Sequence, residues 1–415
     1  MKALLLASLL LQEAPTGFRS AWPEGITRSW VGPEFWANRL QDWRIHRGWL
    51  ECLESSATRP MRVVHLLSRS AGEQAGKLEL RVLCTPLRDG GGSFCGFLLG
   101  AGGSHVDYRL TALVHHRPAQ DGGLVAALDG GGRLVFRDNE KNVAKGGWAI
   151  TGKLREGELL EVPASSRQGT RVPGTLGAVE LRLAARPRGQ DYRLVLSVHV
   201  PESGGELARA VLDDVDPELV AGSLALVAHR GKARFRDFRA SGGKLRSWPE
   251  RSFGPVLAAQ YSLSRGTLKL TAQMPPLGES DTQRAEFQLL DGGSWRTVAG
   301  SRLVVPGYTF PFRVEDFDAT RAWKYRVAYR LRQSVGEKLT SFEGTIRKEP
   351  VGKRRFVLAA FTGNKHFTGG IRWNHDGVWF PHRELVRAVR YHDPDLLFFS
   401  GDQIYEGDLT GAQRR

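Results

Sequence analysis

Cysteine is scarce in this chain of 415 residues, which contains only Cys52, Cys84 and Cys95. No two of them form the close pair that is typical of a zinc site. Cys84 and Cys95 lie in neighbouring strand-like runs, so a disulfide in an oxidising compartment and buried free thiols are both compatible with the sequence. The cysteines therefore leave the compartment open.

Long apolar runs are also missing. No stretch reaches the roughly 18 apolar residues that a membrane-spanning helix needs, so none is expected. Near the start, Met1 and Lys2 precede an apolar run from Ala3 to Leu11, which predicts a signal peptide over residues 1–14. A short buried strand or a misassigned start is the alternative. The signal peptide predicts export to the periplasm, the cell surface or the extracellular space.

The chain has no long block of basic residues, although Lys and Arg exceed Asp and Glu by 15. Basic residues alternate with apolar ones and resemble the solvated faces of strands. We therefore expect no specific nucleic-acid function. The positive charge would instead attract phosphorylated substrates or anionic surfaces.

Glycine and proline are plentiful, with 49 and 20 residues, and they separate short alternating apolar runs. This distribution is typical of strands joined by turns and excludes an all-helical fold. At about 100 to 200 residues per domain, the length predicts two to four domains. We expect a multidomain, mainly β protein.

Residues 25–245 are predicted to form one β sandwich of two sheets. Alternation of apolar and polar side chains is clearest at Leu78–Cys84. Further strands are expected at Phe94–Leu99, Tyr108–Val114, Leu124–Leu128, Arg133–Phe136, Tyr192–Val200 and Leu224–Val227. His115 and His116 follow one of these runs. Because neighbours in a strand point to opposite faces, we expect surface histidines rather than metal ligands.

The segments Trp43–Glu51 and Ala233–Arg239 open and close this region. Their order resembles the concanavalin-like, laminin-G-type jelly-roll domains of exported bacterial enzymes. The resemblance implies a jelly-roll fold and, in many members, binding of glycans or other cell-surface polymers. Trp36, Trp43 and Trp49 could stack on sugar rings, although aromatic residues at strand spacing also form cores.

A polar stretch over residues 242–254 is predicted to be a linker. A second β domain is expected over residues 250–349. Its clearest strand is Trp323–Leu331, where large apolar residues share one face. Together with Thr267–Ala272, Ala285–Leu290 and Gly344–Arg347, this strand predicts an immunoglobulin-like or fibronectin III-like sandwich.

After residue 353 the pattern changes to continuous apolar runs at Phe356–Phe361 and Leu396–Phe399. Such runs are typical of parallel strands that are buried on both faces. Between them, Pro381 and a stripe of Leu385, Val386 and Val389 predict a helix. Strand, helix and strand form a βαβ unit, and α/β enzymes bind ligands at the carboxyl ends of such strands.

The second of these strands is followed by Gly-Asp-Gln-Ile-Tyr at residues 401–405. This motif resembles the PhoD-like alkaline phosphatases of the calcineurin-like metallophosphoesterases. The resemblance implies that Asp402 bridges two metal ions, including Fe and Ca, and that Tyr405 binds one of them. Asn364 and His366, after the first strand, are the further candidate ligands. The implied activity is hydrolysis of phosphate esters by a metal-bound hydroxide.

Residues 353–415 match only the start of such a catalytic domain. The Gly-Asn-His motif and the later histidines of that family are absent, and four candidate ligands are too few for two ions. We therefore expect an inactive N-terminal part of a longer phosphatase. The alternative is an exported carbohydrate-binding or surface-binding β-sandwich protein without catalysis.

Overall fold

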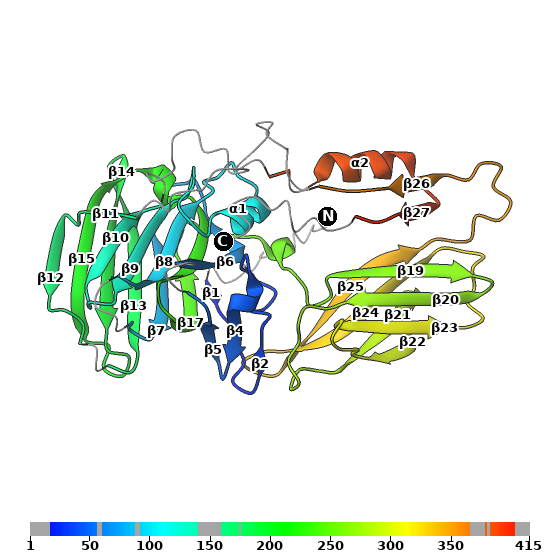
Figure 1. Cartoon of the computed structure of the whole chain (residues 1–415), viewed down its shortest axis with the longest axis horizontal. Helices are drawn as coiled ribbons and strands as arrows, with labels where there is room; N and C mark the ends of the chain where they lie inside the picture. The colour runs from blue at the N-terminus through cyan, green and yellow to red at the C-terminus, as the bar shows by residue number, and fades with distance from the viewer. Residues whose placement is uncertain are drawn as a thin grey trace, which may run out of the picture.

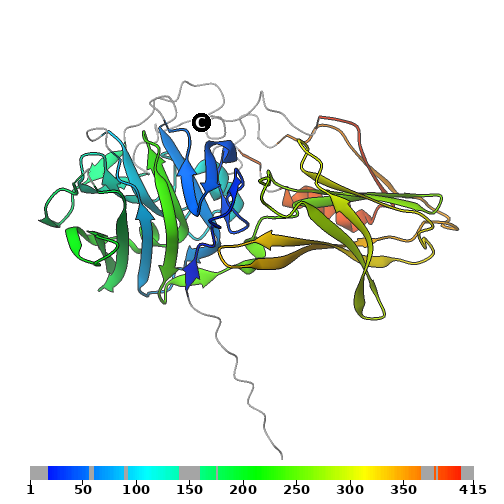
Figure 2. The same cartoon turned by 90° about the horizontal axis from the view of Figure 1, so that it is seen from below.

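The computed structural model describes residues 17–55, 60–87, 92–139, 159–173, 176–365, 378–379 and 382–402. The predicted signal peptide over residues 1–14 lies outside these residues. Two β sandwiches lie side by side along the long axis of the molecule, and a short βαβ unit follows them (Figures 1 and 2). Within the described segments, no helix is long and apolar enough to span a membrane.

The first sandwich is built from two antiparallel sheets. Among the described residues, the larger sheet has ten strands in the order β12-β15-β14-β13-β7-β17-β5-β4-β2, with β1 paired to β17. Its strands are β1 (Phe18–Arg19), β2 (Thr27–Arg28), β4 (Trp43–His46), β5 (Trp49–Cys52), β7 (Leu78–Cys84), β12 (Ser166–Gly169), β13 (Val179–Arg188), β14 (Asp191–His199), β15 (Glu206–Val215) and β17 (Arg234–Ser241).

The smaller sheet has eight strands in the described segments, in the order β11-β10-β9-β8-β16-β6-β18, with β3 paired to β6. Its strands are β3 (Phe35–Trp36), β6 (Met61–Ala71), β8 (Phe94–Ala101), β9 (Leu124–Asp129), β10 (Leu134–Asp138), β11 (Leu160–Val162), β16 (Gly222–His229) and β18 (Leu245–Ser247). Short 3-10 helices are η1 (Leu40–Asp42), η2 (Pro217–Val220) and η3 (Pro249–Arg251).

Alternating apolar side chains from both sheets form one core. In β7, Leu78, Leu80, Val82 and Cys84 are buried at every second position, as the alternation predicts. The expectation of a mainly β protein with a sandwich in its first half is therefore confirmed. All three cysteines are buried and free, and burial raises the pKa of the Cys52 thiol to about 12.

Three local predictions for the first half were wrong. Tyr108–Val114 is the helix α1 rather than a strand, because Asp107 caps its N-terminus and Leu110 and Val114 share one face. His115 and His116 follow this helix and are buried instead of lying on the surface. The expected linker contains β18, which pairs with β6, and the buried Lys244.

The second sandwich encloses a separate core between sheets of three and four strands in the described chain. The three-stranded sheet contains β19 (Ala258–Ser264), β20 (Thr267–Gln273) and β23 (Thr309–Val314), and the four-stranded sheet contains β21 (Arg284–Asp291), β22 (Ser294–Arg302), β24 (Trp323–Arg332) and β25 (Glu337–Ile346). The buried residues of β24 include Trp323, Tyr325 and Val327, on the face that the alternation predicts.

The two sandwiches are joined by a buried ion pair. Arg28 Nη1 lies 2.8 Å from Asp281 Oδ1, and the two side chains are only 2% and 0% exposed. Arg28 also stacks on Trp30, whose indole belongs to the core of the second sandwich. A Cβ at Gly278 would collide with the carbonyl oxygen of Thr27, so glycine permits this close approach.

The predicted strand, helix and strand are β26 (Leu358–Phe361), α2 (Arg383–His392) and β27 (Leu396–Phe399). The two strands pair in parallel, with Phe361 opposite Phe399. Their side chains remain largely exposed, as expected for two parallel strands with one helix to cover them and no neighbouring strands among the described residues. All residues of β27 are about half exposed, and α2 buries no residue, because no further strand or helix of the described chain covers this pair.

Candidate functional site

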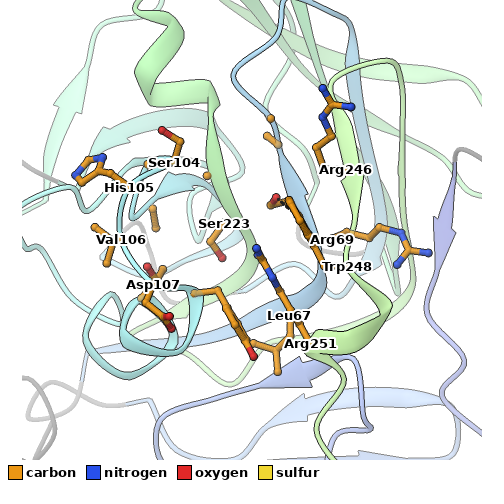
Figure 3. A pocket seen from close by; sticks show the side chains of 18 of the residues that line it. Leu67, Arg69, Ser104, His105, Val106, Asp107, Ser223, Arg246, Trp248 and Arg251 are labelled. Atoms are coloured by element: carbon orange, nitrogen blue, oxygen red, sulfur yellow. Dashed lines mark hydrogen bonds between the residues drawn. The ribbon is translucent and has the colours of Figure 1, made fainter. Parts of the chain in front are cut away.

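A pocket of about 730 Å³ opens at the edge of the smaller sheet of the first sandwich. Its walls come from β6 and the turn after it, the loop between β8 and α1, the start of α1, β16 and η3 (Figure 3). Arg383 of α2 completes the lining. Segments that are far apart in sequence therefore form this site together.

The pocket combines aromatic and polar side chains. Trp248 and Tyr108 supply the aromatic surface, and Ser104, Thr111 and Ser223 supply hydroxyl groups. The Trp248 indole donates a hydrogen bond from Nε1 to Ser70 Oγ at 2.9 Å, which holds the ring in place. Apolar surface with a few convergent polar groups is the usual composition of a small-molecule site.

Arg251 points into this pocket beside Trp248 (Figure 3). Its guanidinium carbon lies 4.0 Å from the ring centroid of Trp248 and 4.6 Å from that of Tyr108. Pro249 begins η3, and its fixed φ suits the first turn of a helix, which places Trp248 and Arg251 side by side. Burial lowers the pKa of Arg251, because the charged form loses hydration.

Asp107 lies across the pocket from Arg251 (Figure 3). It accepts a hydrogen bond from the backbone N–H of Arg109 at 3.0 Å and forms ion pairs with Arg109 and Arg383. Burial acts to raise the pKa of Asp107, but these hydrogen bonds and charges hold it below its usual value. Asp107 is therefore an anion whose charge is already matched by two arginines.

The remaining charged side chains of the pocket are mainly basic. Arg69 donates to the carbonyl oxygen of Ser68, and Arg246 donates to Gln74 Oε1. Neither arginine has a carboxylate within ion-pair distance among the described residues. Glu73, at the rim, is exposed. Positive charge exceeds negative charge in this pocket.

Three buried histidines lie near the pocket. His65 Nδ1 is 2.8 Å from the Oγ of Ser223, which lines the pocket. Complete burial lowers the pKa of His65 to about 3, with smaller contributions from the nearby His115 and His116. His115 Nε2 lies 3.0 Å from the carbonyl oxygen of Gln120, and His116 Nε2 lies 3.0 Å from Asn38 Nδ2.

These histidines do not form a metal site. No group of three or more histidine, cysteine, aspartate or glutamate side chains in the described parts of the chain could hold a metal ion.

The tryptophans that the sequence suggests for sugar stacking are not brought together. Trp43 is completely buried in the core. Trp36 packs edge-on against Phe253 at a centroid distance of 5.0 Å. Trp49 is partly exposed, but Arg234 and Arg236 lie over its ring. None of the three lines the pocket.

The candidate metal ligands fall partly outside the described residues. His366 and Tyr405 lie outside them. Asn364 and Asp402 follow the carboxyl ends of β26 and β27, which are adjacent in the parallel pair. Gly401 adopts φ of 141°, as the sharp turn before Asp402 requires. An amide and a carboxylate are suitable oxygen ligands, but these two residues alone do not complete a metal site.

The first half of the chain is thus a two-sheet β sandwich with a pocket at one edge. No protein-family model matches the chain, and no curated protein matches it. Similar solved structures include lectin II from Ulex europaeus, with 10% identity over 55% of this chain and 97% of that chain and a TM-score of 0.34.

Two other similar structures are the carbohydrate recognition domain of Emp46p in its metal-free form and the exoplasmic/lumenal domain of VIP36 bound to Ca²⁺ and Man3GlcNAc. The first has 13% identity over 49% of this chain and 89% of that chain, with a TM-score of 0.31. The second has 10% identity over 50% of this chain and 84% of that chain, with a TM-score of 0.30. At such low TM-scores, function must be argued from the residues of this chain.

Proposed function

We propose that this chain binds carbohydrate in the pocket beside η3. The observation that carries the proposal is the joint presence of Trp248, Tyr108 and several hydroxyl groups in an open pocket of about 730 Å³. The C–H faces of a sugar ring pack on aromatic rings, while its hydroxyl groups need hydrogen-bonding partners. Carbohydrate binding is the alternative function that the sequence suggests. The residues that line this pocket were not among those that the sequence indicates for it.

The shape of the pocket supports this proposal. The site is open to solvent along one side and large enough for about one or two sugar rings. A longer oligosaccharide could therefore bind with its remaining sugars extending into solvent. Ser223 stands on a sheet strand that is held by β6 and β8 on both sides. Such a rigid support keeps the polar groups in place before the ligand binds.

Replacing Trp248 by alanine is expected to weaken glycan binding by at least about tenfold, since it removes the larger aromatic wall. A glycan array probed with the full chain identifies the ligand, and titration calorimetry measures the loss. Trp295→Ala is the matched control, because Trp295 is partly exposed on the second sandwich and also carries a stacked arginine. Absence of binding to every glycan on the array would refute the proposal.

A second candidate function is metal-dependent hydrolysis of phosphate esters. The observation that favours it is the parallel pairing of β26 and β27, which brings the turns containing Asn364 and Asp402 to one edge. Fe and Ca are the metals that the family resemblance implies. Bound there, the ions would supply a hydroxide nucleophile, and Asp402 would act as a ligand.

We expect the purified product of the whole gene to release p-nitrophenol from p-nitrophenyl phosphate or from its bis ester when Fe, Ca, Mn or Zn is added. Asp402→Asn should abolish this release, because the amide lacks the ligand charge. Asp393→Asn is a control, since Asp393 caps α2 away from the turns. Failure of every metal to stimulate either hydrolysis would exclude this candidate.

Two further assignments, the fold of the second sandwich and the cellular location, accompany these proposals. The seven described strands of the second sandwich support an immunoglobulin-like or fibronectin III-like fold. Export to the periplasm, the cell surface or the extracellular space would bring a carbohydrate-binding pocket to its ligand.

A further inference from the structure

Arg251 is one of three arginines of the carbohydrate pocket, with Arg69 and Arg246, that have no ion-pair partner among the described residues. Within the described residues, no carboxylate lies within ion-pair distance of its guanidinium, and its backbone N–H bonds to the carbonyl oxygen of Trp248. Glu250 and Asp107 act on it only through longer-range charge. Asp107 is already paired with Arg109 and Arg383.

Two aromatic rings hold this guanidinium in a defined orientation. Trp248 and Tyr108 lie on it at centroid distances of 4.0 and 4.6 Å. Stacking restricts the side chain but uses none of its N–H donors. The planar fork of donors therefore remains available at its edge, and its entropy cost on binding is small.

The surroundings favour an anion over a neutral group. Arg69 and Arg246 line the same pocket, and neither has a carboxylate within ion-pair distance in the described chain, although the charge of Glu34 acts on Arg69 over a longer range. Partial burial reduces screening by water, which strengthens attraction to a negative group. An arginine fork matches two oxygens of a carboxylate, sulfate or phosphate group with parallel hydrogen bonds.

We propose that the pocket is selective for carbohydrates that carry an anionic oxygen group, and that Arg251 binds this group while Trp248 and Tyr108 hold the guanidinium in place. The proposal rests on the carbohydrate-binding function proposed above. It adds the chemical class of the ligand and the residue that selects it. The anionic group is a carboxylate, a sulfate ester or a phosphate ester on a sugar.

The test compares ligands that differ only in charge. Trigalacturonate and its trimethyl ester have the same rings and length, but only the first carries carboxylates. We expect trigalacturonate, or a sulfated or phosphorylated trisaccharide measured in parallel, to bind at least about tenfold more tightly than its neutral counterpart. The preference should shrink as salt is raised from 50 to 500 mM, on the order expected for charge screening.

Arg251→Gln should abolish this preference, and Arg251→Lys should keep part of it, because lysine retains the charge but loses the fork. Arg326→Gln is the matched control, since Arg326 stacks on Trp295 at 4.6 Å in the second sandwich, far from the pocket in sequence and fold. Thermal unfolding verifies that each variant is folded. Equal weakening by Arg326→Gln would overturn the assignment to Arg251.

The outcomes separate this inference from the function on which it rests. If neutral and charged trisaccharides bind equally, the pocket binds carbohydrate but the anionic selectivity is wrong. A third result is that no glycan binds, yet inorganic sulfate at millimolar concentration raises the melting temperature of the wild type and not of Arg251→Gln. That result would support an anion site at Arg251 and refute the carbohydrate-binding function. If neither glycans nor sulfate bind, both are refuted.

Discussion

Replacing Arg28 by leucine will lower the free energy of unfolding by about 3 to 5 kcal/mol, because it leaves the Asp281 carboxylate buried without its partner. Asp281 is 0% exposed, and its other oxygen accepts a hydrogen bond from the Gly278 N–H at 2.8 Å. That single bond cannot replace the lost ion pair. Urea unfolding monitored by circular dichroism measures the loss, which should appear first as separation of the two sandwiches.

A double-mutant cycle shows whether the loss comes from the orphaned charge. Arg28→Leu combined with Asp281→Leu should restore part of the stability, since it removes the orphaned charge, while the Gly278 N–H loses its acceptor. Arg313→Gln is the control, because the ion pair of Arg313 with Glu315 is more than half exposed and its loss should leave stability almost unchanged. Equal losses from Arg28→Leu and Arg313→Gln would contradict the role assigned to the buried pair.

Acidification should destabilise the first sandwich through His65. Its pKa is lowered from the ordinary 6.5 to about 3, because complete burial of the ring penalises the charged form and because His115 and His116 lie nearby. The unfolded chain binds the proton at higher pH than the folded chain does. The contribution is therefore fully present above about pH 6.5 and is lost progressively as the pH falls towards 3, at up to about 1.4 kcal/mol per pH unit.

The measurement is the slope of unfolding free energy against pH between 6.5 and 4. His65→Gln should make this slope shallower by up to one proton, even where it lowers stability at neutral pH. His392→Gln is the control, since His392 is exposed at the end of α2. An unchanged slope in His65→Gln would show that another group carries the acid sensitivity.

Period-two alternation predicted the sheets well because burial of one strand face depends on the strand's own residues. Leu78–Cys84 and Trp323–Leu331 are examples, since each lies within an observed strand. Tyr108–Val114 misled this reasoning, because Leu110 and Val114 satisfy helical spacing as well as strand alternation. Asp107, a favoured helix cap, was the available signal for the helix.

The pocket could not be predicted in the same way. Trp248 and Arg251 lie in a segment whose polar composition predicts a linker, and Tyr108, which stacks on Arg251, lies 251 − 108 = 143 positions earlier in the chain. Pairing of β18 with β6 and the hydrogen bonds of Trp248 to Ser68 and Ser70 of β6 bring η3 to the edge of the sandwich. The spacing of Trp248, Pro249 and Arg251 indicates a helical turn, but no local pattern shows what that turn faces.

Asp107 links this pocket to the C-terminal part of the chain. It pairs with Arg383 of α2, and Val378 is buried against Leu110 and Val114 of the same helix α1. Thermodynamic linkage is reciprocal, so a ligand that binds more tightly when this contact is formed must strengthen the contact by the same free energy. Binding of a sugar in the pocket would then be measurable as slower hydrogen exchange of the backbone amides of α2, which lies on the other side of the Asp107–Arg383 ion pair.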